Sequence, residues 1–348
     1  KTFGSSYFAA KKSHWEKGPL FVADVRSMGI NAVETTVELN GPSDLWARRR
    51  RTSSLTVELP ASGSAPGTDH LRSTYDLEKV LGRGAVGTVY KATRRADERQ
   101  VVVKVRNVID DKEVSRSCRH EFEVLKNMTH QHIIRALDFL EQDGETALIL
   151  EYCCEETLHS IVKQTYPGGL PEERLKPLSL MLCEAVDYLH GRRIVHRDIK
   201  PANVLVSDDL NRLWLADFNT AYQLMDGWAL SMTGTMDFAA PEVLQDESPS
   251  EKADIWSLGL SLYFMALGKL PRKLGDFHGN LTAFAAAVSK PLTFGTEWQF
   301  IDGTVKELIQ QCLTVEKSYR PSTMELLDQI HENGDGDLEL SVRRTSSI

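Results

Sequence analysis

The stretch His196-Arg-Asp198-Ile-Lys200-Pro-Ala-Asn203, followed at once by the apolar run Val204-Leu-Val206, decides how this 348-residue chain is interpreted. The apolar run is typical of a short buried strand. Directly before it, one short loop carries a carboxylate, an ammonium group and a carboxamide, on Asp198, Lys200 and Asn203. Charged groups beside a buried strand are costly unless they are paired or have a task, so this loop indicates a functional site.

A second polar group follows the next strand along the chain. The run Arg212–Leu215 is predicted as a strand, and Asp217-Phe-Asn219 comes soon after it. Phosphoryl transfer needs metal ligands, a cation for the phosphate and an oriented hydroxyl, because the protein itself does little covalent chemistry. Asp198 would face the acceptor hydroxyl and Lys200 the transferred phosphate. Asn203 and Asp217 would hold a metal ion.

Upstream of these motifs, a glycine-rich segment, Gly82-Arg-Gly84-Ala-Val-Gly87, lies between two predicted strands, Leu77–Leu81 and Thr88–Ala92. Glycine has no Cβ, so such a turn lets the backbone approach and cover phosphates closely. A dinucleotide-binding turn or a plain hairpin would explain the pattern equally well. A dinucleotide-binding turn opens a helix, whereas this chain continues as a strand, which argues against the first alternative.

Lys104 stands inside Val101-Val-Val-Lys-Val105, a run that otherwise suits a buried strand. A lysine in such a run costs free energy unless its ammonium group is paired. One alternative is an edge-strand lysine that points to solvent. The natural partner is Glu121, on an apolar-faced helix predicted over Lys112–Met128. Glu123 is the competing candidate, but it would face elsewhere on that helix.

Further motifs complete the pattern: Ala240-Pro-Glu242, Asp254-Ile-Trp256-Ser-Leu-Gly259 and Arg320-Pro321. Together with the motifs above, they resemble the protein kinase family over about Tyr75–His331. The resemblance implies an α+β, two-lobed fold: a small antiparallel β lobe with one helix over residues 75–152, and a larger, mainly helical lobe over residues 153–331. Glu242 and Arg320 resemble the family's buried structural ion pair.

The resemblance implies ATP and Mg²⁺ as cofactors and protein serine or threonine hydroxyls as acceptors. Lys104 would contact the α- and β-phosphates while paired with Glu121. Asp198 would be the catalytic base or the residue that orients the hydroxyl, and Lys200 would steady the γ-phosphate. The two metal ligands named above would hold Mg²⁺.

The resemblance also implies where the nucleotide binds. Glycines would cover the phosphates, three apolar side chains would sandwich the adenine, and a hinge between the lobes would border it. The glycines are Gly82, Gly84 and Gly87, and the apolar side chains are Val89, Val102 and Leu205. The hinge is Glu151 to Cys153, with Leu150 as gatekeeper. Lys200 together with Gly234-Thr235 resembles the serine/threonine branch of the family. The helical pattern around Leu260–Leu270 is closest to that of calmodulin-dependent kinases.

Some positions depart from the family pattern. Asn219 stands where the family has a glycine, and asparagine is the next residue best able to adopt positive φ. Val102 replaces an alanine and narrows the adenine slot, while Ala136 replaces a larger apolar residue and could leave a gap. Asn219 and Ala136 favour an alternative function, a pseudokinase acting as a nucleotide-binding scaffold. A small-molecule kinase is disfavoured by the complete Gly234–Glu242 segment.

The same resemblance suggests how activity is switched. Arg197 directly precedes the catalytic aspartate, a pairing that in this family marks activation by phosphorylation in the segment after Asp217. Ser231 is the expected site, and Thr233 is the near alternative. If neither is modified, these are ordinary loop hydroxyls and apolar packing orders the segment. Thr235 is expected to hydrogen-bond near Asp198 instead.

Composition narrows the class of protein further. The chain is 41% hydrophobic and 26% charged with a net charge of −8, so no global field attracts nucleic acid or anionic lipid. Five cysteines, an odd number without framework spacing, predict a reducing, intracellular compartment such as the cytoplasm. The longest apolar stretch, Ile255–Gly268, is too short to span a bilayer and is predicted as a buried helix.

The two ends of the chain differ from the rest. Residues 1–70 are predicted to be a flexible extension and linker, and residues 332–348 a polar tail. The near-copies Arg50-Arg-Thr-Ser-Ser-Leu55 and Arg343-Arg-Thr-Ser-Ser-Ile348 resemble substrates of basophilic kinases. An upstream kinase of that kind would act on Ser53 or Ser346. The alternative is a solvated basic patch beside serines.

Overall fold

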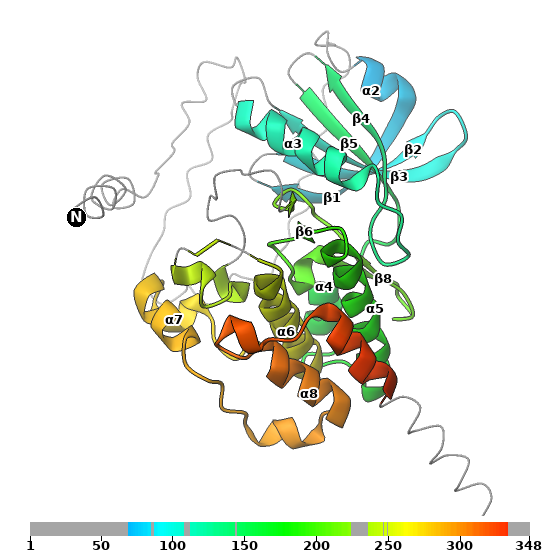
Figure 1. Cartoon of the computed structure of the whole chain (residues 1–348). Coiled ribbons are helices and arrows are strands. Elements are labelled where there is room, and N and C mark those ends of the chain that lie inside the picture. The colour runs from blue at the N-terminus through cyan, green and yellow to red at the C-terminus, as the bar shows by residue number, and fades with distance from the viewer. Residues whose placement is uncertain are drawn as a thin grey trace, which may run out of the picture. The chain divides into compact units, whose positions relative to one another are not determined.

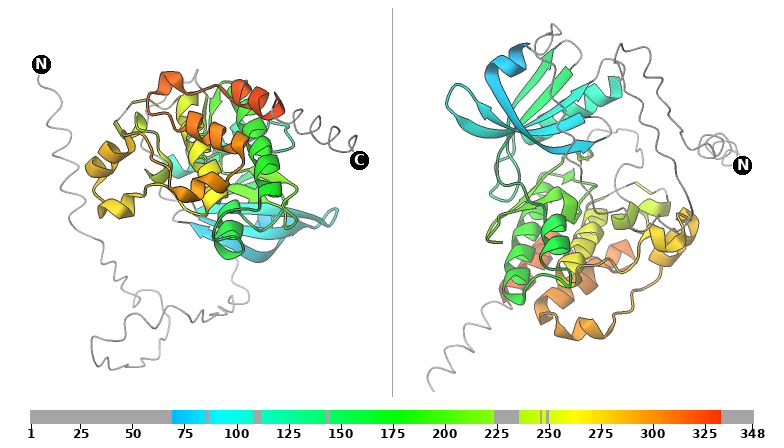
Figure 2. Two further views of the ribbon diagram at one scale, coloured as in Figure 1. Left: turned by 90° about the horizontal axis from the view of Figure 1, so that it is seen from below. Right: turned by 180° about the vertical axis from the view of Figure 1, so that it is seen from behind.

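The computed structural model describes residues 69–84, 87–107, 112–142, 145–223, 236–245, 247–248 and 250–332. They belong to one of the two compact units of the chain, Ser62–Ile348. They form a small lobe built on a sheet and a larger helical lobe, as Figures 1 and 2 show. The predicted α+β, two-lobed fold is confirmed. The predicted flexible extension and polar tail lie almost entirely outside the described residues.

Five antiparallel strands form the small lobe, in the order β1-β2-β3-β5-β4. The strands are β1 (Tyr75–Gly84), β2 (Gly87–Arg94), β3 (Arg99–Asn107), β4 (Ala136–Gln142) and β5 (Glu145–Glu151). A short helix, α2 (Asp69–Thr74), precedes the sheet, and α3 (Lys112–Leu125) follows β3. The helix predicted over Lys112–Met128 ends at Leu125, where the N–H of Met128 donates to the carbonyl of Leu125 in a closing turn.

The residues of β3 alternate between two cores, as the two-residue period of a strand requires. Val101 and Val103 are fully buried in a small cluster on one face of the sheet. Val102, on the other face, is buried in the main core. Lys104 and Arg106 share this second face, which places both cations toward α3.

The large lobe is mainly helical. Its helices are α4 (Leu158–Gln164), α5 (Glu172–His190), α6 (Glu251–Leu267), α7 (Leu281–Val288), α8 (Gly303–Cys312) and a last helix over residues 323–332. Its short strands are β6 (Ile194–Val195), β7 (Val204–Val206), β8 (Leu213–Leu215) and β9 (Tyr222–Gln223), paired β6 with β9 and β7 with β8. Its 3-10 turns are η2 (Pro201–Asn203), η3 (Met236–Phe238), η4 (Val243–Gln245), η5 (Leu274–Phe277), η6 (Thr296–Phe300) and η7 (Lys317–Tyr319).

Helix α6 lies at the centre of the large lobe and is buried almost along its whole length, from Ala253 to Ala266. A Cβ on Gly259 would lie 2.5 Å from the Cβ of Cys312, so glycine permits the close approach of α6 to α8. The helix ends at Gly268, which adopts φ 65°. Among the described residues, no helix has both the length and the apolar character that crossing a membrane requires.

Candidate active site

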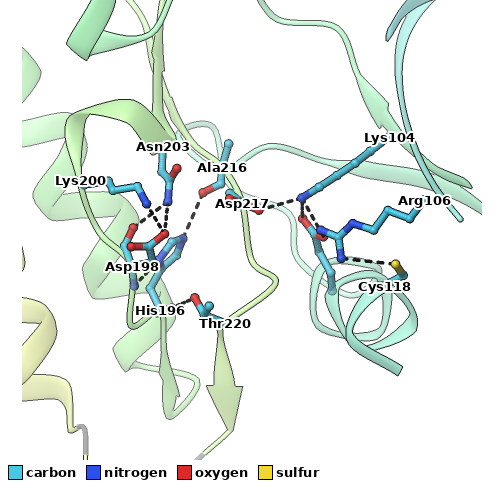
Figure 3. Close-up of polar contacts among 11 residues, drawn as sticks. Lys104, Arg106, Cys118, His196, Asp198, Lys200, Asn203, Ala216, Asp217 and Thr220 are labelled. Carbon is cyan, nitrogen blue, oxygen red and sulfur yellow. Dashed lines mark hydrogen bonds and ion pairs between the residues drawn. The ribbon is translucent and has the colours of Figure 1, made fainter. Parts of the chain in front are cut away.

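Lys104 contacts two carboxylates from different parts of the chain. Its Nζ lies 2.9 and 3.0 Å from the carboxylate oxygens of Glu121 on α3, and 2.7 Å from Oδ1 of Asp217 in the large lobe. Burial alone lowers the pKa of Lys104, but the two carboxylates outweigh it and raise the pKa above its ordinary value. Glu123, the competing candidate, pairs with Lys126 at the surface. Lys104 is therefore a charged, positioned ammonium group (Figure 3).

Arg106 is a second cation at the same carboxylate, which the sequence interpretation missed. Its Nη2 lies 3.4 Å from Oε2 of Glu121, and its Nη1 donates to the thiol sulfur of Cys118 at 3.3 Å. Glu121 is only 1% exposed, so two cations compensate one buried carboxylate. The signal was present in the sequence, because a residue two positions after Lys104 on a strand shares its face.

Asp198 is held by two donors from its own loop. Its Oδ2 accepts from Nζ of Lys200 at 2.6 Å and from Nδ2 of Asn203 at 2.9 Å. The same amide also donates to the backbone carbonyl of Asp198 at 2.8 Å. The 3-10 turn that Pro201 begins brings Asn203 back toward Asp198. The three side chains predicted from the loop motif therefore converge, as Figure 3 shows.

The backbone of this loop is anchored by Asp254 on α6, a residue quoted in a sequence motif but given no role there. Asp254 is 1% exposed and accepts the backbone N–H groups of His196 at 2.7 Å and Arg197 at 2.9 Å. Arg197 has φ 69°, a left-handed conformation that is strained for a residue with a side chain. The ring of His190 also contacts this carboxylate, with its Nε2 3.1 Å from Oδ2 of Asp254.

His196 itself is fully buried and packs against the segment that carries Asp217, an expected metal ligand. Its ring packs edge-on against Phe218 with centroids 4.7 Å apart, and its Nε2 lies 3.2 Å from the carbonyl oxygen of Ala216. Burial lowers the pKa of His196 below its ordinary value. The hydroxyl of Thr220 donates to the carbonyl of His196 at 3.0 Å, which ties the two loops together.

Asp217, rather than Asn219, has the left-handed backbone in this segment. Asp217 has φ 64°, and Asn219 is not among the described residues with positive φ. The expectation that Asn219 replaces glycine because of positive φ was therefore wrong. Burial alone would raise the pKa of Asp217, but the positive charge of Lys104 lowers it by more. The pKa therefore lies below its ordinary value. The side chain stays partly exposed, at 34%.

The residues expected around the adenine belong to the main core or pack against it. Val102 and Leu150 are buried, and Val89 and Leu205 are half-buried beside the same cluster. Ala136 is also buried in it. That they enclose an adenine ring stays a prediction.

The hinge residues expected beside the adenine differ in what they can offer. Glu151 exchanges hydrogen bonds with Arg135, since its N–H donates to the Arg135 carbonyl and its Oε1 accepts the Arg135 N–H, both at 2.9 Å. Its side chain is thereby engaged. Burial raises the pKa of the half-buried Cys153 thiol, which is therefore uncharged at neutral pH. The contact of the hinge with a nucleotide stays a prediction.

The expected phosphate-covering glycines differ in what surrounds them. A Cβ on Gly87 would lie 2.3 Å from the carbonyl oxygen of Val105, so the pairing of β2 with β3 itself requires glycine here. A Cβ on Gly82 would meet nothing within 4 Å. Packing therefore does not require glycine at position 82, and its expected approach to phosphates stays a prediction. Gly84 ends β1, and its surroundings lie outside the described residues.

The expected metal ligands suit a hard cation that is also bound by phosphates. Nδ2 of Asn203 is directed at Asp198, which leaves its amide oxygen as the atom for a cation. Oxygen donors of this kind are those that Mg²⁺ prefers, together with water and phosphate oxygens. Within the described residues, no three histidine, cysteine or acidic side chains are grouped to hold a metal ion by themselves.

The predicted structural ion pair is formed in the large lobe. Nη1 of Arg320 lies 2.7 Å from Oε1 of Glu242, and its Nη2 lies 2.8 Å from Oε2. The guanidinium group also donates to the backbone carbonyls of Thr314, Lys252 and Val315. Every donor of the buried arginine side chain thus has an acceptor nearby, as a buried charge requires.

Comparison with known proteins agrees with this geometry. A family model described as "Protein kinase domain" matches residues 75–331. Serine/threonine-protein kinase Aurora-1 of Arabidopsis thaliana is 30% identical over 286 residues, which cover 79% of this chain and 92% of that protein. Serine/threonine-protein kinase chk-2 of Caenorhabditis elegans is 32% identical over 259 residues, 71% of this chain and 54% of that protein.

An Aurora kinase of Patiria pectinifera is 28% identical over 272 residues, 78% of this chain and 65% of that protein. The chain spans about two thirds or less of the length of this and other curated relatives. A particular likeness to calmodulin-dependent kinases stays a prediction. The expected phosphorylation sites Ser231, Thr233, Ser53 and Ser346, and the expected role of Thr235, lie outside the described residues.

Proposed function

Since this chain belongs to the protein kinase family, we propose that it is a serine/threonine protein kinase that transfers the γ-phosphoryl group of ATP to protein hydroxyls. One observation carries the proposal above the others. Lys104 is held between Glu121 and Asp217, at 2.9 Å and 2.7 Å, so that an ammonium group from the small lobe and a carboxylate from the large lobe meet. Such an arrangement positions a cation for phosphates beside a ligand for their metal ion.

The chain's own residues have distinct tasks in this mechanism. Asp198 would accept a hydrogen bond from the acceptor hydroxyl, orienting its oxygen toward the phosphorus and taking its proton as the new bond forms. Lys200, 2.6 Å from Asp198, would place its ammonium group on the transferred phosphoryl oxygens. The oxygens of Asn203 and Asp217 would hold Mg²⁺, which when bound neutralises negative charge on the phosphates.

The nucleotide would bind against apolar residues of the main core. Val89, Val102 and Leu205 would enclose the adenine, with Leu150 behind it and the main chain of Glu151 to Cys153 at its edge. Gly82, Gly84 and Gly87 would cover the phosphates. The kinase domain would extend over residues 75–331, divided after residue 152, with residues 1–70 and 332–348 as flanking segments.

Regulation by phosphorylation forms part of the proposal. Arg197 would bind a phosphate on Ser231 or Thr233 through its planar guanidinium group, which can donate two parallel hydrogen bonds. Activity would then fall on phosphatase treatment. A basophilic upstream kinase would act on Ser53 or Ser346, where a hydroxyl follows paired arginines.

The alternative of a nucleotide-binding scaffold without activity gains no support from the two residues that suggested it. Asn219 has no strained backbone to accommodate, and Ala136 is buried within the continuous main core.

The function is tested by incubating the full chain with radiolabelled ATP, Mg²⁺ and a panel of one acidic and one basic carrier protein. We expect transfer of label, with acid hydrolysis releasing phosphoserine or phosphothreonine. Omission of Mg²⁺ should abolish the transfer. Label recovered only as phosphotyrosine, or no transfer to any protein, would contradict the proposal.

A further inference from the structure

One face of α4 lies beside the loop that carries the proposed catalytic residues. α4 packs against η2, the turn that ends this loop. The residue before α4, Thr157, also forms a β-bridge with Leu205. The residue of η2 that is exposed to solvent is Ala202, so the turn itself adds no charge at this place. The start of α4 is thus held next to the loop that carries Asp198.

Two cationic or titratable side chains of α4 are fixed over one aromatic ring. His159 stacks on Phe264 of α6, with centroids 5.5 Å apart and ring planes 10° apart. Nζ of Lys163 lies 5.2 Å from the centroid of the same ring and donates to the carbonyl of Gly268 at 2.7 Å. Both residues are nevertheless exposed. Because they are already held in place, less conformational entropy is lost when they bind a partner.

A third residue, the exposed Lys273, extends this region from the segment after α6. Burial lowers the pKa of His159, and the positive charges of Lys163 and Lys273 lower it as well. Both ammonium groups therefore act electrostatically on the imidazole ring of His159. Neither lysine forms an ion pair with a carboxylate of the described residues. We call His159, Lys163 and Lys273 the basic surface.

Two carboxylates, those of Asp276 and Asp237, hydrogen-bond to the backbone of this segment. Asp276 accepts the N–H of Lys273 at 2.9 Å, and Asp237 accepts the N–H of Leu274 at 2.6 Å. The second bond joins the basic surface to η3, directly before the Ala240-Pro-Glu242 motif. The basic surface therefore lies on two elements, α4, which packs against η2, and the segment after α6, which is bonded to η3.

Lysines elsewhere around the hinge are paired with a carboxylate, unlike the two lysines of the basic surface. Lys79 of β1 and Lys91 of β2 both contact the carboxylate of Glu155. Lys91 also lies over the ring of Tyr152 and 3.2 Å from its hydroxyl. One carboxylate offsets part of the positive charge there, whereas Lys163 and Lys273, which give the basic surface its positive charge, form no ion pair with a carboxylate of the described residues.

We propose that the basic surface binds anionic side chains of the protein substrate, so that the enzyme selects hydroxyls flanked by acidic or phosphorylated residues. This inference rests on the proposed kinase function and names its class of substrate. Opposite charges at such a surface attract the substrate and suppress partners of like charge. The paired arginines beside Ser53 and Ser346 would be repelled, so another kinase would modify those sites in trans.

The test compares peptides that share one serine acceptor and differ only in three flanking residues on each side: aspartate, phosphoserine, alanine or lysine. With the full wild-type chain, we expect kcat/KM for the aspartate peptide to exceed that for the lysine peptide by about tenfold or more, mainly through KM. Lys273→Glu should lower this ratio by about fivefold, and Lys163→Glu should do the same. Lys306→Glu, an equal charge change on α8, should leave the ratio unchanged.

The outcomes separate the inference from the function on which it rests. A higher kcat/KM for the phosphoserine peptide than for the aspartate peptide would identify a previously phosphorylated substrate as the source of the anion, and equal values an acidic one. Phosphorylation of all peptides without preference, or a preference for lysine, would overturn the inference while leaving the kinase function intact. An unchanged ratio in Lys273→Glu, with normal kcat on the alanine peptide, would also overturn it. No transfer to any peptide would contradict the kinase function itself.

Discussion

The carboxylate of Asp254 on α6 holds the backbone of His196, whose N–H it accepts at 2.7 Å although 58 residues separate the two in sequence. It also accepts the N–H of Arg197, which has φ 69°. A non-glycine residue keeps this conformation only where the surrounding contacts impose it. A buried helix of the large lobe thus sets the shape of the loop that carries Asp198.

The first prediction follows from this anchor. Asp254→Asn replaces one acceptor oxygen by an NH₂ group that faces a backbone N–H, which leaves a buried donor unsatisfied at about 1–3 kcal/mol. We expect kcat to fall by about tenfold or more, with KM for ATP changed only a few-fold, because the loop loses its geometry. Steady-state kinetics would measure this, with the exposed Asp328→Asn as control. An unchanged kcat would show that the loop keeps its shape without Asp254.

The second prediction concerns the buried ion pair of Glu242 and Arg320. Glu242→Gln leaves a fully buried guanidinium group without its counter-charge, which typically costs about 3–5 kcal/mol. We expect urea unfolding to show that the free energy of unfolding of the variant is lower by this amount. Glu297→Gln, which breaks the exposed pair with Lys269, should have little effect. Equal losses in the two variants would contradict the structural role of the buried pair.

The third prediction tests Asn219. Because Asn219 does not need positive φ, Asn219→Gly relieves no strain and only adds conformational freedom to the unfolded chain. We expect activity within a few-fold of wild type and a loss of stability of about 0.5–1 kcal/mol. Loss of nearly all activity would instead assign the asparagine side chain a task of its own.

The fourth prediction is a dependence of stability on pH. Burial lowers the pKa of His196, and it also lowers those of His130 and His159. Such a histidine binds more protons in the unfolded chain than in the folded one. Its contribution to the stability of the fold is therefore present above the unfolded pKa of about 6.5 and is lost as the pH falls below that value. We expect Tm to decrease between about pH 7 and pH 5.5. The decrease should be smaller in His196→Phe, and an equal decrease would exclude His196 as a cause.

Local motifs were the part of the site that could be predicted from sequence. Asp198, Lys200 and Asn203 converge because they lie on one short loop, and the strand period directs Lys104 toward Glu121. The anchor at Asp254 could not be predicted, since no local pattern indicates which helix a distant loop will contact. The sequence interpretation explained Gly87 only by its approach to phosphates. The close pairing of β2 with β3 also requires glycine at this position. The positive φ was expected at Asn219 but lies at Asp217, because the residue type alone does not determine which position of a turn adopts it.

The most direct test of the central claim is the rate of phosphoryl transfer by Asp198→Asn compared with wild type, at saturating ATP and Mg²⁺. Asparagine keeps the size of the side chain but cannot take a proton. The substitution therefore destabilises the transition state more than it weakens the binding of ATP. The account predicts that kcat falls by about a hundredfold or more while the affinity for ATP, measured by calorimetry, stays within a few-fold. A variant with near-normal kcat would show that Asp198 does not serve the reaction and would contradict the account.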